Sequence, residues 1–154
     1  MPSVRKSYDE ELLQLDTLLA RMGHEAGAAI ESALTALRND DIELARSVVA
    51  RDSQIDASEH EIEHRCLQLL LRQQPVATDL RNISAALKMI SDLERVGDYA
   101  VDIAELSPYL AKAQISGKVH LSEMALAAVD MVKQSVQAFV DGDIPVSYTH
   151  LRAH

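Results

Sequence analysis

Apolar and small residues recur every three or four positions through most of this sequence, and this spacing limits the fold class. In the first such stretch the repeating positions are Leu12, Leu15, Leu19, Met22, Ala26, Ala29, Ala33 and Leu37. The spacing places these side chains on one face of an α-helix. We therefore expect a long amphipathic helix that begins near Leu12 and ends near Asn39, where Asn and Asp favour a turn.

The same spacing predicts two more long helices. In the second stretch the repeating positions are Ile42, Ala45, Val49, Ile55, Ile62, Cys66 and Leu69. This helix should end before Pro75, because a residue that precedes proline disfavours the helical conformation. A third helix is expected from about Thr78 to Leu106, with a break at Pro108. Three long helices with short connections pack most simply as an up-down-up bundle.

The composition favours an all-α fold. The 154 residues include only 5 glycines and 4 prolines, and 47% of them are hydrophobic. With one phenylalanine and no tryptophan, the core must consist mainly of aliphatic residues, which favours closely packed helices over a β-sandwich. The net charge of −9 should repel phosphate backbones and anionic lipids, so nucleic acid is not an expected partner.

The sequence also indicates a cytoplasmic protein. The single cysteine, Cys66, lies at an apolar position of the second predicted helix and is expected to be a core thiol. A chain with one cysteine forms no intrachain disulfide, which is typical of a reducing compartment. Residues 1–10 lack the apolar stretch of a secretory signal, and no apolar run approaches the length of a membrane span. Direct insertion into a membrane is therefore not expected.

A fourth apolar helix is expected from about Leu121 to Val140, and it resembles a repeat of the first helix. The alignment without gaps pairs Met124 with Met22, Ala128 with Ala26, Ala138 with Ala36, Asp143 with Asp41 and Ile144 with Ile42. After residue 144 the apolar periodicity stops. We therefore expect a three-helix bundle over residues 1–112, a partial second repeat of one helix over residues 113–144, and an unrelated tail over residues 145–154. The second bundle is expected to be truncated.

Acidic residues form a stripe on each of two neighbouring predicted helices. The stripes consist of Asp52, Asp56, Glu59 and Glu63 on the second helix and Glu94, Asp98, Asp102 and Glu105 on the third. The apolar run Leu80, Ile83, Leu87 and Ile90 continues at helical spacing into Glu94 and Asp98, so these two carboxylates are expected in the apolar seam. An unpaired buried ion costs on the order of several kcal/mol. These acids therefore need water, basic partners or bound cations.

Two interpretations of the stripes follow. In the first, the acids are a solvated helix face or form ion pairs with the nearby basic residues Arg51, Arg65, Arg81, Lys88 and Arg95. In the second, Asp52-x-x-x-Asp56 and Glu94-x-x-x-Asp98 bind a cation, with Mg, Mn or Fe preferred because all the donors are oxygens. Gly97, between Glu94 and Asp98, allows another helix or a ligand to approach closely.

Another interpretation uses the histidines. Glu61-x-x-His64 matches the dimetal motif of ferritin-like bundles, and His60 lies four residues before His64. That site class needs a second Glu-x-x-His, which the sequence lacks, so surface histidines are the preferred interpretation. No nucleophile with an adjacent base and no phosphate-binding glycine loop is present. We therefore do not expect an enzyme.

Two long motifs resemble the PhoU family of phosphate-signalling regulators. They are Gln74-Pro75-Val76-Ala77-Thr78-Asp79-Leu80-Arg81 and Asp92-Leu93-Glu94-Arg95-Val96-Gly97-Asp98-Tyr99-Ala100-Val101-Asp102-Ile103-Ala104-Glu105. The resemblance extends from about Tyr8 to Ile144 and also includes Asp52 and the segment from Ile55 to Cys66.

The resemblance implies a PhoU-like up-down three-helix bundle followed by the first helix of a truncated second bundle. Acidic motifs in the family bind metal clusters in some members, which assigns Glu94, Asp98, Asp52 and Asp56 as candidate ligands of Fe, Mn, Mg or Zn. It also implies a cytoplasmic, non-enzymatic negative regulator of phosphate uptake and of the phosphate-starvation response (the Pho regulon).

Partners and oligomeric state follow from the same resemblance. The expected partners are the phosphate-sensing histidine kinase and the ATPase subunit of the phosphate ABC transporter, and the full-length form is expected to be a homodimer. This sequence departs from the family by lacking the last two helices of the second bundle and their acidic motif. A metal-binding or metal-oxidising ferritin-like bundle is the alternative function.

Overall fold

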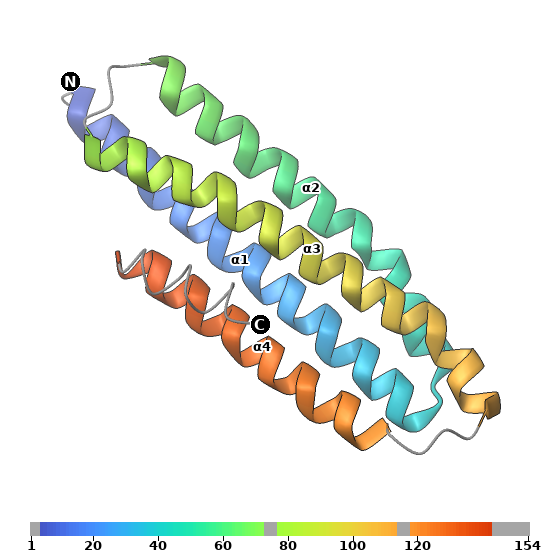
Figure 1. The fold of residues 1–154 in the computed structure, drawn as a ribbon. Helices are drawn as coiled ribbons and strands as arrows, with labels where there is room; N and C mark the ends of the chain where they lie inside the picture. Colours follow the sequence, from blue (N-terminus) through green and yellow to red (C-terminus); the bar gives the residue numbers. More distant parts are fainter. Residues whose placement is uncertain (1–3, 73–76, 114–117, 143–154) are drawn as a thin grey trace.

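The computed structural model describes residues 4–72, 77–113 and 118–142, and these residues form four α-helices. They are α1 (Val4–Asn39), α2 (Ile42–Arg72), α3 (Ala77–Ala113) and α4 (Lys118–Val140). Helices α1, α2 and α3 alternate in direction and pack against one another, which confirms the predicted all-α, up-down-up bundle (Figure 1). The predicted tail, residues 145–154, lies outside the described residues.

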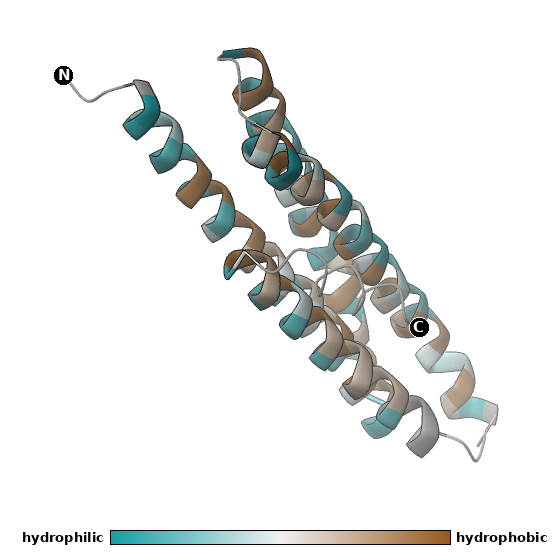
Figure 2. Ribbon diagram, turned by 60° about the vertical axis from the view of Figure 1, so that its left-hand side comes forward, coloured by the Kyte–Doolittle hydropathy of each residue, from teal (hydrophilic) through white to brown (hydrophobic). Residues whose placement is uncertain are grey.

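The core of the bundle is aliphatic. Its largest fully buried side chains include Leu15, Leu19, Met22, Ile62, Ile83, Met89 and Leu93. Polar and apolar residues alternate along the helices, as amphipathic helices require (Figure 2). Cys66 is buried in this core, as expected. Within the described ranges, no helix is long and apolar enough to cross a membrane.

Helix α4 runs antiparallel to α1 and packs mainly on it, on the side away from α2 (Figure 1). A Cβ added at Gly23 of α1 would lie 2.6 Å from Cγ2 of Val136, so any larger residue at this approach would force Val136 or α4 to shift. A Cβ at Gly27 would lie 3.7 Å from Cγ1 of Val129, which is an ordinary van der Waals contact distance. In the repeat alignment Val129 is the counterpart of Gly27, so the two helices meet through equivalent positions.

Three helix ends differ from the sequence-based expectation. Helix α1 begins at Val4, eight residues before the predicted start at Leu12. Tyr8 is buried and extends the apolar face of the helix toward its N-terminus. Helix α3 continues through Pro108 to Ala113. An internal proline removes one helical hydrogen bond, at a cost of about 3 kcal/mol; the buried Ser107 and half-buried Leu110 on either side show that this part of α3 still packs on the bundle. Helix α4 begins at Lys118.

The seam of α3 also lies slightly away from its predicted path. Leu80 is 43% exposed, whereas Asp79 beside it is buried. The buried positions of α3 at helical spacing include Ile83, Ala86, Ile90, Leu93, Gly97, Ala100 and Ala104. On α2, Ile42 and Val49 are likewise exposed rather than in the core. At Ala86 and Gly97, small residues occupy core positions that the helical pattern assigned to their larger neighbours Leu87 and Asp98.

An ion pair joins the beginnings of α1 and α3. Arg5 donates two hydrogen bonds to Asp79, with N–O distances of 2.7 and 3.3 Å. The guanidinium of Arg5 also lies over the ring of Tyr8, 5.6 Å from its centroid. Because the side chain of Asp79 is only 3% exposed, the pair supplies charge compensation that a buried carboxylate requires.

Candidate metal centre

Five carboxylates gather where the middle of α2 meets the middle of α3. Asp52, Asp56 and Glu59 come from α2, and Glu94 and Asp98 come from α3. We call these five residues the acidic cluster. Within it, Asp56, Glu59 and Glu94 each offer one carboxylate oxygen, and these three oxygens lie within 4.8 Å of one another. All three side chains are half-buried.

Gly97 explains how the two helices bring these acids together. A Cβ at Gly97 would lie 3.1 Å from Cδ1 of Ile55 and 3.4 Å from Oδ1 of Asp52. Without a side chain at this position, α2 can approach α3 closely in the turn between Glu94 and Asp98. The sequence-based role of Gly97 as a point of close approach is therefore confirmed.

The site residues lie beside the seam rather than in it. Asp98 is exposed and Glu94 is half-buried, while Leu93 and Gly97, which directly precede them, are buried. The expectation that Glu94 and Asp98 replace core residues is therefore wrong for Asp98. An acidic side chain that flanks a helix contact can keep part of its carboxylate in water, which lowers the desolvation cost of its negative charge.

Burial and mutual repulsion raise the pKa of three of these acids. Burial is the largest cause for Glu94, followed by the negative charges of Asp98 and Glu59, which raise its pKa further. Burial also raises the pKa of Asp52, and the charges of Asp56 and Asp98 add to the effect. For Glu59, burial is again the main cause, and the neighbouring His60 partly opposes the rise in pKa. The cluster thus holds negative charge at a free-energy cost.

No basic side chain in the described part of the chain forms an ion pair with the cluster. Arg65, one of the expected partners, instead pairs with Glu61 and donates a hydrogen bond to Gln14. Moreover, Oδ1 of Asp52 is buried without a hydrogen-bond partner. The described structure therefore does not support the ion-pair interpretation, and the donor set fits a hard or borderline cation.

Not every predicted ligand joins the closest group. Asp56 and Glu94 belong to it, whereas Asp52 and Asp98 do not. Asp98 lies within side-chain hydrogen-bonding reach of Glu94, and its negative charge raises the pKa of both Glu94 and Asp52. Glu59 completes the group; the sequence signal for it was its position three residues after Asp56 on the same helix face.

The remaining acids and the histidines are not members of this close group. Glu63, Asp102 and Glu105 are exposed. His60 and His64 are exposed as well and do not join the close carboxylates. Glu61, which the ferritin-like interpretation needs as a ligand, pairs with Arg65.

These features define an all-α protein with an acidic cluster between two helices of a three-helix bundle. Residues 19–107 match the family model described as the PhoU domain. The chain is 35% identical over 151 residues to a phosphate-specific transport system accessory protein PhoU homolog from Clostridium acetobutylicum, covering 94% of this chain and 67% of that protein. The chain therefore belongs to the PhoU family.

Solved structures agree with this assignment. The crystal structure of PhoU from Pseudomonas aeruginosa matches with a TM-score of 0.85 and 30% sequence identity, over 92% of this chain and 69% of that one. The phosphate transport system regulatory protein PhoU from Streptococcus pneumoniae matches with a TM-score of 0.82 and 27% identity, over 93% of this chain and 68% of that one.

The chain is shorter than its relatives. A PhoU homolog from Xylella fastidiosa is 45% identical over 102 residues, which cover 66% of this chain and 42% of that protein. A homolog from Aquifex aeolicus is 36% identical over 135 residues, which cover 61% of that protein. The chain thus spans between 42% and 67% of the length of these curated relatives.

Proposed function

We propose that this chain is a non-enzymatic accessory protein of phosphate transport that restrains phosphate uptake and represses the phosphate-starvation response. The observation that carries the proposal is the match of residues 19–107 to the PhoU domain, together with relatives described as phosphate-specific transport system accessory proteins. In this role the helical bundle acts in the cytoplasm as an adaptor between the transporter's ATPase subunit and the sensor histidine kinase. A homodimer is the proposed full-length form.

The acidic cluster is proposed to bind a divalent cation or a metal cluster. Asp56, Glu59 and Glu94 would supply the nearest oxygens, and Asp52 and Asp98 would add charge or further ligands. The proposal is supported by the 4.8 Å grouping, the absence of ion pairs to the cluster in the described chain, and the buried oxygen of Asp52. A bound cation would offset the repulsion between carboxylates and so hold α2 against α3.

For the domain organisation we propose a complete repeat over residues 1–112 and one helix of a second repeat over residues 113–144. The support is the antiparallel packing of α4 on α1 through equivalent positions such as Gly27 and Val129. Residues 143 and 144 lie outside the described part.

A genetic test addresses the regulatory role. In a bacterial strain that lacks its own regulator, expression of this chain, or of the longer gene if the source genome encodes one, should restore repression of an alkaline phosphatase reporter in high phosphate. Unchanged constitutive expression from a stably produced protein would contradict the proposal. A variant that combines Asp56→Asn and Glu94→Gln would show whether regulation needs the acidic cluster.

The cation is tested separately by elemental analysis of purified protein after dialysis without chelator. We expect about one or more metal ions per chain, lost in the variant that combines Asp56→Asn and Glu94→Gln. Asp102→Asn is the matched control, because Asp102 is an exposed acid of the same helix. Equal, negligible metal in all three proteins would contradict the cation proposal without affecting the regulatory one.

A further inference from the structure

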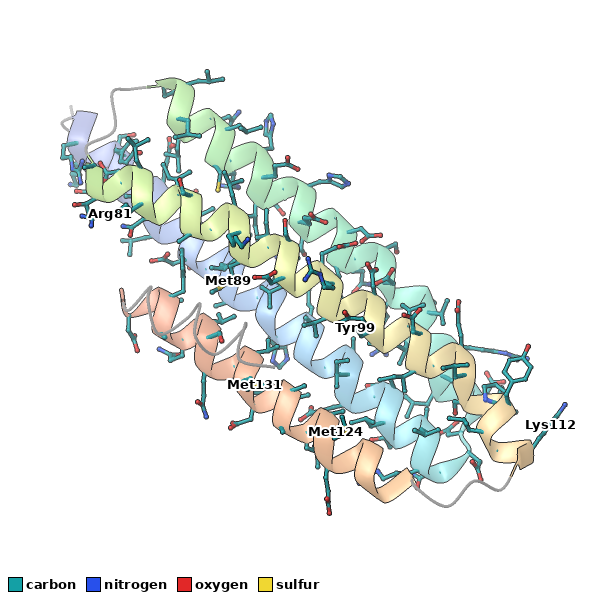
Figure 3. All side chains as sticks on the ribbon, in the orientation of Figure 1. Arg81, Met89, Tyr99, Lys112, Met124 and Met131 are labelled. Atoms are coloured by element: carbon teal, nitrogen blue, oxygen red, sulfur yellow. The ribbon has the colours of Figure 1, made fainter. Side chains whose placement is uncertain are left out.

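The outer face of α3 carries a continuous stripe of charged and polar residues. It runs from Arg81 to Lys112, which Figure 3 labels near the two ends of the helix. Its positions are residues 81, 84, 88, 91, 95, 98, 102, 105, 109 and 112, and all of them are exposed. Buried residues such as Leu93 and Gly97 lie on the opposite side of the helix. The stripe, which we call the α3 stripe, therefore faces away from the three-helix bundle.

The two halves of the α3 stripe carry opposite charges. The basic half consists of Arg81, Ser84, Lys88, Ser91 and Arg95. The acidic half that follows consists of Asp98, Asp102, Glu105 and Tyr109. Within the described ranges, Lys88, Arg95 and Glu105 form no ion pair with any other residue. The separation of the charges along the helix thus leaves both halves without a partner of opposite charge.

The spacing of the α3 stripe fits a second helix. Its positions alternate between steps of three and four residues throughout. This alternation averages about 3.5 residues, the repeat that keeps two supercoiled helices facing each other along their length. Between residues 84 and 109 the stripe is about 38 Å long, at about 1.5 Å per residue. The stripe therefore offers an extended seam for one helix.

An antiparallel copy of the same stripe is complementary to it. If two copies of α3 cross between residues 95 and 98, each basic position faces an acidic one. The facing pairs are Ser84 with Tyr109, Lys88 with Glu105, Ser91 with Asp102, and Arg95 with Asp98. Each pair occurs twice, because a two-fold axis relates the copies. Like charges meet only at the ends, where Arg81 would face Lys112, so the contact is confined to residues 84–109.

The same contact would bring positive charge to the acidic cluster. Asp98 belongs to both the cluster and the α3 stripe, and no basic side chain in the described part of the chain pairs with the cluster. Arg95 of a second copy would lie beside Asp98. Asp98 is not one of the three closest acids, so Asp56, Glu59 and Glu94 would remain available to a cation.

The part of the relatives' chains that follows α4 is the alternative occupant of the stripe. The match covers 67% of the relative from Clostridium acetobutylicum. Helix α4 packs mainly on α1, and under the repeat alignment the next two helices would pack on α4 as α2 and α3 pack on α1. This arrangement places them beside α4, whereas the α3 stripe lies on the side of α3 opposite its buried seam. The reversed order of charges that the stripe requires is supplied by a second copy of the chain.

We propose that the α3 stripe is an interface between two copies of this chain, which bind in antiparallel orientation through Lys88 with Glu105 and Arg95 with Asp98. The proposal rests on the homodimer proposed above and adds its surface and orientation. Exposed ion pairs are individually weak, so we expect weak self-association that decreases at high salt. The net charge of −9 on each copy opposes the contact at long range, but about 0.1 M salt screens this repulsion beyond about 10 Å.

Exchanging the charges of one facing pair tests the interface. In analytical ultracentrifugation of the whole chain at about 0.1 M salt, Lys88→Glu and Glu105→Lys should each weaken self-association by about tenfold, because each places two pairs of like charges in contact. The chain that carries both substitutions should recover to within about threefold of the parent. A mixture of the two single variants should show the same recovery.

Matched controls separate the interface from net charge. Arg46→Glu and Glu43→Lys make the same changes in net charge at an exposed ion pair of α2, and they should leave self-association nearly unchanged. Circular dichroism and melting temperatures establish that each variant folds.

Several results would overturn the proposal. A parent chain that stays monomeric at about 1 mM would exclude the interface. Self-association that Lys88→Glu leaves unchanged would place the contact on another surface, and failure of the double exchange to restore it would exclude the antiparallel register. If the source gene encodes a longer chain, a monomer of that chain whose melting temperature falls with Lys88→Glu would identify the remainder of the same chain as the occupant. Failure of the phosphate reporter test with the exchange pattern intact would contradict the regulatory role alone and would support the interface.

Discussion

Gly23 of α1 lies so close to Val136 of α4 that a Cβ at residue 23 would come within 2.6 Å of Cγ2 of Val136. One turn further along α1, Gly27 leaves an ordinary gap of 3.7 Å to Val129. Both glycines are buried within the same helix contact. Their surroundings therefore predict opposite effects for the same substitution.

Gly23→Ala should destabilise the packing of α4, and Gly27→Ala should not. Alanine gains about 1 kcal/mol over glycine in a helix interior, but at residue 23 the clash forces Val136 or α4 to move, and overpacking costs typically 1–3 kcal/mol. We expect Gly23→Ala to lower the free energy of unfolding by up to about 2 kcal/mol and Gly27→Ala to raise it by up to about 1 kcal/mol. Urea denaturation of the two variants beside the parent chain measures both. Equal effects of the same sign would show that the close contact at Gly23 does not hold α4.

A divalent cation should stabilise the chain through the acidic cluster. At a free cation concentration of 100 times the dissociation constant, binding to the folded state alone contributes about 2.7 kcal/mol. We expect Mn²⁺ to raise the melting temperature of the parent chain and EDTA to reverse the rise. The combination of Asp56→Asn and Glu94→Gln should abolish this response, whereas Asp102→Asn should retain it. A Mn²⁺-dependent rise of equal size in all three proteins would assign the effect to nonspecific charge screening.

Without metal, lowering the pH from neutral should stabilise the protein. Folding raises the pKa of Glu94, Asp52 and Glu59, mainly by burial. The folded state therefore binds more protons than the unfolded state between the ordinary and the raised pKa values, so stability falls as the pH rises through this window. Below about pH 4, the ordinary pKa of Asp and Glu side chains, the three acids are protonated in both the folded and the unfolded state, and this destabilisation is absent.

Thermal unfolding in EDTA across the mildly acidic range measures this dependence. The parent chain should lose more stability than Glu94→Gln as the pH rises, because the variant lacks one of the repelling charges. Glu105→Gln, which removes an exposed acid of the same helix, is the control and should follow the parent. If Glu94→Gln shows the same slope as the parent, Glu94 is not a source of the repulsion.

Cys66 should resist alkylation until the protein unfolds. Burial raises the pKa of its thiol to about 12, and the charge of Glu63 adds to the rise. The reactive thiolate is therefore scarce at neutral pH, and the buried sulfur is also inaccessible. Iodoacetamide labelling followed by mass spectrometry should be negligible in buffer and should rise with urea along the unfolding curve. Rapid labelling of the folded chain would show that the core around Cys66 opens locally.

Apolar periodicity predicted the four helices, and the two long motifs predicted the family. The ends of the helices were harder to predict. Pro108 was expected to break α3, yet the buried Ser107 and half-buried Leu110 keep that segment packed and helical. Local sequence signals carry no measure of such tertiary packing.

In the candidate site, too, the sequence predicted some features correctly and missed others. Asp56 and Glu94 were predicted and lie close together, and the helix register already placed Glu59 on the same face. The exposure of Asp98 was missed, because the real seam passes through Gly97, which has no side chain, and Ala100, whose methyl group contributes little to a hydrophobic pattern. These two residues matter because they let the backbones of two helices approach closely. Whether the helices do so depends on the neighbouring helix as well as on the helix that carries the small residues.

The pairing of Gly27 with Val129 has a consequence for the history of the fold. Under the repeat alignment these are the same position in two successive units, so α1 and α4 meet as the corresponding helices of a symmetric dimer would. Under the domain organisation that we propose, duplication of a single unit that made this contact with a second copy of itself would have joined the two copies covalently. The glycine at residue 27 and the valine at residue 129 would then be the diverged descendants of one position.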